Sequence, residues 1–256
     1  MPAEPILLTQ SMNVDVRFPD GTTKRLLADI DVKIAEGQCL AIVGESGSGK
    51  TTLGRAVARL LPATMTVTGN IVTRGRVGYM VQDAASALNP VRRVTWQVAE
   101  ALRARGVSRS NRADMVLDLL GRCGLPDPDQ YARRYPHELS GGLAQRVLLA
   151  AVLATEPTII VADEPTSALD VTTQARVIAL LKDLISHTNL SLMIVTHDLT
   201  VAAHIGDHIS VMRGGRIVEQ GPVAQVFADA QHPYTRELLA ALPKRSRASI
   251  ELEARP

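Results

Sequence analysis

Cysteine is scarce in this sequence, with only Cys39 and Cys123 among 256 residues. The two lie far apart and lack the spacing of metal ligands, which is typical of reduced thiols inside a cell. An excess of one charge is also missing, because 28 basic residues stand against 26 acidic ones and the two signs are interleaved. We therefore expect two structural thiols and no nucleic-acid partner.

Long hydrophobic runs are absent as well. The apolar run over Val147–Ala154 is soon followed by Thr155, Glu156 and Pro157, well short of the roughly 18 to 20 residues that cross a bilayer. The first residues contain no basic segment followed by an apolar one, as a secretory signal would. We expect a chain that stays inside the cell and takes part in membrane events only through partners.

Short apolar runs are present, and they have the composition of buried strands: Gln38–Val43, Thr158–Ala162 and Leu190–Val195. Helical spacing of apolar residues occurs between them, from Thr52 to Leu61 and from Thr172 to Ser186. Strands that alternate with helices favour a parallel sheet. The sequence therefore predicts an α/β fold.

The chain opens with a different pattern. Residues 6–18 and 26–34 partly alternate apolar with polar and flank the turn signal Pro19–Gly21, which predicts an antiparallel β-section. Between positions 84 and 155, apolar residues recur at helical spacing. We also predict a β-like stretch over Gly69–Gln82, a hairpin over Ile209–Val218 that turns at Gly214–Gly215, and a helix over Pro233–Leu242.

The segment Gly44–Thr51, with the sequence GESGSGKT, fits the phosphate-binding loop and stands between a buried strand and a helix. Glycines let backbone N–H groups turn toward phosphates, and the helix N-terminus adds partial positive charge. Lys50 should bridge the β- and γ-phosphates, and Thr51 should ligate Mg²⁺; the alternative is a flexible glycine-rich turn. The predicted nucleotide-binding residues here are Gly44, Glu45, Ser46, Gly47, Ser48, Gly49, Lys50, Thr51 and Thr52.

Two adjacent carboxylates, Asp163 and Glu164, end a buried strand, an expensive arrangement unless a cationic or reactive group lies beside them. Asp163 should hold a nucleotide-bound Mg²⁺, directly or through water, and Glu164 should act as the general base toward the attacking water. By itself, Asp-Glu before Pro165 could equally be the acidic first turn of a helix.

Ser140, Gly141 and Gly142 precede a helical pattern over Leu143–Ala154, which would place a hydroxyl and two unobstructed N–H groups at a helix N-terminus. That arrangement predicts a second anion site. The simpler interpretation is an ordinary N-cap at Ser140.

These motifs together resemble the ABC ATPase family, and the resemblance covers nearly the whole chain. Its motifs occur here in the family's order: the loop at Gly44, Gln82, Leu139–Gly142, Asp163–Glu164, Ser167–Asp170 and His197. The resemblance implies a head-to-tail dimer in which the Ser140 segment of one subunit closes over the γ-phosphate held by the other.

The resemblance also implies roles for single residues. Gln82 would sense Mg²⁺ and the attacking water, and His197 would contact the γ-phosphate and stabilise transition-state charge. Asp170 would orient the catalytic centre across the dimer interface. Phe18 lies where the family stacks an aromatic ring on adenine, although it could be an ordinary core phenylalanine.

Three segments resemble the dipeptide, oligopeptide and nickel importer branch: Gly44–Lys50, Gln82–Pro90 and Gln231–Leu239. Resemblance to that branch implies that the chain works with a second, different ATPase subunit, two transmembrane permease subunits and an extracytoplasmic solute-binding protein. This chain would then sit peripherally on the cytoplasmic face of the membrane and drive uptake of a solute, a di- or oligopeptide, with nickel or another metal chelate as the alternative.

Some details depart from the branch. Leu143 stands where this branch often has Met, and the Gly69–Gln82 stretch is shorter than is common. The cysteine-bearing C-terminal segment of many peptide transporters has no counterpart here, so no iron–sulfur site is predicted and a nickel-type or other short member becomes more plausible.

Functions of other classes remain open at this point. A soluble ABC ATPase in an assembly role, such as iron–sulfur cluster assembly, has the same architecture but lacks support from the segment His232–Thr235. A DNA-repair clamp would need long coiled coils, and sustained heptads are absent. A regulatory cassette that binds ATP without turnover is disfavoured by the intact Lys50, Asp163, Glu164 and His197.

The resemblance implies a P-loop NTPase core with an N-terminal antiparallel β-section and an inserted helical subdomain. We expect one ABC ATPase domain over 1–243, made of a nucleotide-binding core (1–83 and 156–230), a helical subdomain (84–155) and a C-terminal helix (231–243), with a solvated tail at 244–256. The surface formed by Leu88–Pro90 and Trp96 is a candidate groove for a permease helix, although Trp96 could equally belong to the core.

Overall fold

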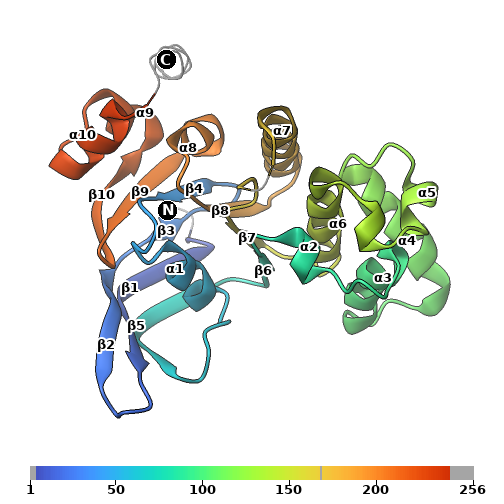
Figure 1. The fold of residues 1–256 in the computed structure, drawn as a ribbon, viewed down its shortest axis with the longest axis horizontal. Coiled ribbons are helices and arrows are strands. Elements are labelled where there is room, and N and C mark those ends of the chain that lie inside the picture. The colour runs from blue at the N-terminus through green and yellow to red at the C-terminus, as the bar shows by residue number, and fades with distance from the viewer. Residues whose placement is uncertain (1–3, 168, 243–256) are drawn as a thin grey trace.

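A six-stranded sheet forms the centre of the computed structural model, which describes residues 4–167 and 169–242 (Figure 1). Its strand order is β10 (Arg216–Pro222), β9 (His208–Arg213), β4 (Cys39–Val43), β8 (Ser191–Thr196), β7 (Ile159–Asp163) and β6 (Val77–Met80). All neighbours are parallel except β10 and β9, which form the predicted hairpin. The predicted parallel α/β sheet is confirmed.

Strands β4, β7 and β8 are buried on both faces, which explains their unbroken apolar sequences. Alternate side chains serve different cores: Leu40 and Ile42 of β4 belong to one apolar cluster, whereas Ala41 and Val43 belong to the other. This sheet therefore separates two cores, and the edge where β4 and β7 end is held rigidly from both sides.

An antiparallel sheet lies over one face of the central sheet. It pairs β1 (Leu7–Arg17) with β2 (Thr23–Ile30), β3 (Lys33–Ile34) and β5 (Met65–Thr73). Helix α1 (Lys50–Val57) lies between the two sheets, with Leu53 and Val57 in the same core as residues of β1 and β4.

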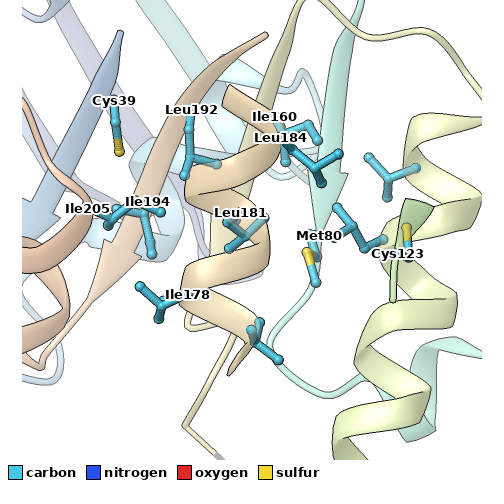
Figure 2. Close-up of a cluster of buried hydrophobic side chains, with 14 of the residues drawn as sticks. Cys39, Met80, Cys123, Ile160, Ile178, Leu181, Leu184, Leu192, Ile194 and Ile205 are labelled. Carbon is cyan, nitrogen blue, oxygen red and sulfur yellow. The ribbon is translucent and has the colours of Figure 1, made fainter. Parts of the chain in front are cut away.

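Helices cover the opposite face and extend beyond it (Figure 1). They are α2 (Ala84–Ala87), α3 (Val94–Ala104), α4 (Arg109–Arg122), α5 (Pro128–Ala132), the 3-10 turn η1 (Pro136–Glu138), α6 (Gly141–Leu153), α7 (Val171–His187) and α8 (Leu199–Ile205). Figure 2 shows Ile178, Leu181 and Leu184 of α7 between Ile194 of β8 and Met80 of β6. Side chains of α3, α4 and α6 continue this core away from the sheet.

Two boundaries differ from the sequence prediction. Helix α1 begins at Lys50, directly after Gly49, and ends at Val57 rather than Leu61, because Arg59 adopts φ +57°. The stretch Gly69–Gln82 is divided near Gly75 (φ +77°) into β5 and β6, which belong to different sheets. Helix α9 (Val223–Ala228) was not predicted, whereas α10 (Pro233–Ala240) falls within the predicted helix.

Other expectations concern single side chains. Cys39 and Cys123 are buried free thiols, and burial raises the pKa of both. Trp96 is 41% exposed and so is not a core residue, whereas Leu88 is buried and does not belong to the candidate groove.

Among the helices of the described ranges, none is both long and apolar enough to cross a membrane. The tail predicted at 244–256 lies outside the described residues.

Candidate active site

The phosphate-binding loop connects the end of β4 to the start of α1, at the edge where the central parallel strands end. Gly44 is required there, because a Cβ at this position would lie 2.2 Å from the Met212 carbonyl oxygen. Gly49 is the N-cap residue of helix α1, and in the described structure no side chain caps this helix end. Its first N–H groups are therefore available to bind an anion.

Lys50 is almost completely buried, and its Nζ donates to the carbonyl oxygens of Gly44 (2.7 Å) and Glu45 (2.8 Å). Burial lowers the pKa of Lys50, while the carboxylates of Glu164 and Asp163 act in the opposite direction. A cation is thus held inside the loop, on carbonyl partners that a phosphate oxygen could replace.

Asp163 ends β7 and is 3% exposed. Thr51 donates its hydroxyl to Asp163 Oδ1 (3.0 Å), and Tyr79 of β6 donates its hydroxyl to Asp163 Oδ2 (2.8 Å). Burial and this bond to Asp163 raise the pKa of Tyr79, so Tyr79 remains a proton donor. The orientation of the Asp163 carboxylate is fixed from both sides.

Glu164 follows in a left-handed backbone conformation (φ +45°), which is rare for a residue with a side chain. Its N–H donates to the Val195 carbonyl oxygen (2.8 Å), which ties this turn to β8. Gln82 Nε2 donates to Glu164 Oε2 (3.1 Å), and His197 Nδ1 lies 3.2 Å from Glu164 Oε1. Three predicted catalytic side chains from three segments therefore meet at one carboxylate.

A cavity of about 580 Å³ joins these groups. Its lining consists of Leu26, Ser46, Gly47, Gly49, Lys50, Thr51, Thr52, Gln82, Glu164 and His197. Leu26 is the one lining residue that was not predicted. Gly44, Glu45 and Ser48 belong to the same loop without lining the cavity, and Asp163 reaches it through Thr51.

The oxygen atoms of Thr51, Gln82 and Asp163 fit the predicted Mg²⁺, which prefers oxygen ligands and is usually held by one or two carboxylates together with substrate phosphates. The bond between Thr51 and Asp163 brings two of these ligands together. Within the part of the chain that the structure describes, no group of three or more His, Cys, Asp or Glu side chains is placed to hold a metal.

The predicted second anion site forms a separate cluster. Ser140 is exposed at the N-terminus of α6, and in the described structure its side chain makes no capping hydrogen bond, which argues against the simple N-cap. A Cβ on Gly142 would lie 2.3 Å from Thr173 Cγ2, so α6 packs tightly on α7. Thr173 donates its N–H (3.0 Å) and its hydroxyl (2.7 Å) to Asp170, and these bonds lower the pKa of Asp170.

This cluster is not part of the cavity at Lys50. Figure 1 shows α6 displaced from α1 along the long axis of the molecule. Phe18 directly follows β1, is 43% exposed and does not line the cavity either. One chain thus assembles the phosphate-binding and carboxylate residues and leaves Ser140, Gly141, Gly142 and Asp170 elsewhere.

Sequence reasoning missed Tyr79. The available signal was a single polar aromatic residue in the apolar run just before Gln82, in a strand that pairs with β7 so that Tyr79 stands opposite Val161. Because Tyr79 and Asp163 lie 84 positions apart in the sequence, their contact could be found only once the order of the strands was known.

The chain is similar in sequence to known proteins. Residues 27–167 match the family model described as ABC transporter. The chain is 37% identical to the oligopeptide transport ATP-binding protein OppD of Lactococcus lactis subsp. cremoris, over all of this chain and 81% of that protein. It is 40% identical to a putative peptide import ATP-binding protein of Brucella ovis, over 84% of this chain and 71% of that protein.

Solved structures show the same fold. MJ0796, described as a bacterial ABC transporter cassette with a dimeric structure, has a TM-score of 0.74 at 26% identity, over 85% of this chain and 98% of that chain. The cbiO1 protein of Clostridium perfringens, described as part of the ABC transporter complex cbiONQ, has a TM-score of 0.75 at 26% identity, over 96% and 99% of the two chains.

Proposed function

This chain belongs to the ABC transporter family as one of its ATPases, and we propose that it powers the uptake of peptides through separate membrane subunits. The observation that supports ATP hydrolysis, which would power this uptake, is the convergence of Lys50, Gln82, Glu164 and His197 on one cavity. The peptide substrate is supported by the relatives, whose names are those of oligopeptide and peptide import proteins. The same names do not favour a nickel importer or a role in cluster assembly.

We propose that the loop binds ATP through the first N–H groups of α1, and that Lys50 exchanges its carbonyl partners for β- and γ-phosphate oxygens. Thr51, Asp163 and Gln82 would hold Mg²⁺, which offsets charge on the phosphate oxygens when bound. Tyr79 keeps the Asp163 carboxylate turned toward Thr51.

Glu164 is placed to take the proton of the attacking water. Gln82 and His197 hold the two oxygens of its carboxylate, and His197 is exposed toward the same cavity, where it can stabilise charge on the γ-phosphate. These contacts hold the general base in its strained backbone turn before any substrate arrives.

We propose that Ser140, Gly141, Gly142 and Asp170 act on the nucleotide of a second cassette in a head-to-tail pair. Support comes from the exposure of Ser140, from its place outside the cavity, and from MJ0796, a cassette of the same fold with a dimeric structure. The second cassette would be a different ATPase subunit, and Phe18 would stack on adenine.

The remaining proposed partners are two permease subunits and an extracytoplasmic solute-binding protein, with this chain on the cytoplasmic face of the membrane. The helical subdomain (84–155) would face the permeases, and residues 1–83 and 156–230 would form the nucleotide-binding core. Asn89, Pro90 and Trp96 would line the groove for a permease helix, since all three are exposed and Val91 beside them is 75% exposed.

Affinity capture of the chain from its native membranes, with mass spectrometry of the recovered proteins, tests this function. We expect two permeases and a second ATPase; a peptide-binding protein from the same system would then supply the substrate for an uptake assay with labelled peptides. Recovery with soluble partners alone would overturn the transport function. A complex that takes up metal chelates and no peptide would overturn the peptide assignment only.

A further inference from the structure

The C-terminal helix α10 touches the phosphate-binding loop. Tyr234, the second residue of α10, is 2% exposed, and its hydroxyl oxygen accepts a hydrogen bond from the backbone N–H of Glu45 (3.0 Å). Glu45 is the second residue of the loop and lies 189 positions earlier in the sequence. The motif around Tyr234, which marked the importer branch, therefore reaches the nucleotide site directly.

This bond holds a part of the loop that has few other fixed contacts. The carbonyl oxygen of Glu45 accepts from Lys50 Nζ (2.8 Å) and from the N–H of Ser48 (3.2 Å). If Lys50 Nζ turned to phosphate, its bond to the Glu45 carbonyl oxygen would break. The bond from Glu45 N–H to Tyr234 does not involve Lys50, and neither Glu45 nor Tyr234 lines the cavity. Tyr234 can therefore keep the start of the loop in place in both states.

Tyr234 is itself held firmly. The guanidinium of Arg213, at the end of β9, lies 4.6 Å from the centre of its ring. Its N–H donates to His232 Nδ1 (3.2 Å), and the carboxylate of Glu219 in β10 accepts from the N–H groups of Gln231 (2.7 Å) and His232 (3.1 Å). The start of α10 is thus fixed to the β9–β10 hairpin, and through Tyr234 this hairpin supports the loop.

We propose that Tyr234 is a positioning residue for the phosphate-binding loop, which holds Glu45 N–H and so keeps the loop in the shape that accepts phosphates. The inference rests on ATP binding at this loop and is independent of the transported solute. A contact of this kind acts on bound and reacting nucleotide alike, so its loss should weaken binding and leave the chemical step unchanged.

Tyr234→Phe tests the role, because it keeps the ring under Arg213 and removes only the acceptor. Tyr131→Phe is the matched control, since the Tyr131 ring also lies against an arginine, Arg134, at 4.4 Å, but away from the loop. We expect the Kd for ATP to rise about two- to tenfold in Tyr234→Phe, the size of one neutral hydrogen bond, with kcat at saturating MgATP within about twofold of the parent and with no change in the control.

Amide hydrogen exchange of the nucleotide-free protein gives the direct readout. Glu45 N–H should exchange faster in Tyr234→Phe, while the amides of β4 and α1 keep their protection; faster exchange across all three would mean general loosening and would overturn the specific role. Unchanged exchange at Glu45 together with an unchanged Kd would also overturn it. If the parent protein bound no ATP, the proposed function would fail, while the exchange rate at Glu45 would still test the contact.

Discussion

The two regions predicted to bind phosphate differ in how complete they are within one chain. At the cavity, Lys50, Asp163 and Glu164 already have hydrogen-bond or ion-pair partners among the other site residues. At the N-terminus of α6, Ser140 is exposed and its side chain makes no capping bond in the described structure. The cavity residues thus already have partners within the chain, whereas Ser140, which we assign to the nucleotide of a second cassette, is left open.

The largest effect on the cavity region is expected from removing the general base, Glu164. Glu164→Gln keeps the size of the side chain but cannot accept the proton of water, so the rate of ATP hydrolysis should fall about 10²- to 10⁴-fold. ATP binding should persist and trap the closed pair of cassettes. Steady-state ATPase assays and size-exclusion chromatography with MgATP check both points. The exposed Glu237→Gln is the control, and a parental rate in Glu164→Gln would disprove the assignment.

A smaller loss is expected from Tyr79→Phe. The substitution removes the hydrogen bond to Asp163 Oδ2 and frees the carboxylate to rotate away from Thr51. Because hydrogen bonds to charged groups contribute about 1.5–3 kcal/mol, the Mg²⁺ concentration for half-maximal hydrolysis should rise on the order of tenfold. The affinity for ATP measured without Mg²⁺ should stay the same; if it fell in parallel, Tyr79 would support the loop rather than Asp163.

The α6 region can be perturbed through its packing. In Gly142→Ala the new methyl group would lie 2.3 Å from Thr173 Cγ2, and Thr173 cannot rotate away without breaking its hydroxyl bond to Asp170. The free energy of unfolding should fall by about 1–3 kcal/mol. In the control Gly121→Ala, also within a helix, the nearest atom is Pro128 Cγ at 3.6 Å, so stability should hold or rise. Urea titration of both variants distinguishes these outcomes.

The smallest effect concerns pH and α10. Burial acts to raise the pKa of Glu219, but the Thr235 hydroxyl beside it and the N–H groups of Gln231 and His232 outweigh burial, and the net pKa is lowered. Folding thus favours the ionised form, and this stabilisation is complete above the unfolded pKa of about 4.3 and is lost as pH falls through the lower folded value.

The Tm of the parent should therefore exceed that of Glu219→Gln slightly at pH 7, and the difference should shrink below about pH 4.3. Thermal scans of the two proteins across this range provide the measurement. A difference that grew on acidification would contradict the direction of the pKa shift.

The parts of the fold that could be predicted are those that depend on residues close together in the sequence. Strands β4 and β7 were predictable because burial on both faces produces unbroken apolar runs, and the phosphate-binding loop because its glycines and Lys50 occur at fixed offsets. The division of the Gly69–Gln82 stretch was not predictable. Strand β5 pairs with β1 and β6 pairs with β7, and such long-range pairing leaves little trace in a short segment.

Contacts at the site show the same limit. Gln82 and His197 were assigned by family resemblance and Glu164 from its place after a buried strand, and the structure adds that Gln82 and His197 both contact Glu164. The bonds from Tyr79 to Asp163 and from Glu45 N–H to Tyr234 join residues 84 and 189 positions apart. No spacing rule predicts such bonds, since they depend on the order of strands and on where α10 packs.

The ATP affinity of the isolated, monomeric chain tests most directly whether the two regions serve different nucleotides. Calorimetry on Lys50→Ala and Ser140→Ala compares one residue from each region under the same conditions. Our account predicts that Lys50→Ala weakens ATP binding at least about tenfold, as expected for loss of a charged contact, whereas Ser140→Ala leaves the Kd unchanged and lowers only the ATPase rate of assembled cassettes. Equal weakening in both variants would show that Ser140 acts on the nucleotide of its own chain and would contradict the account.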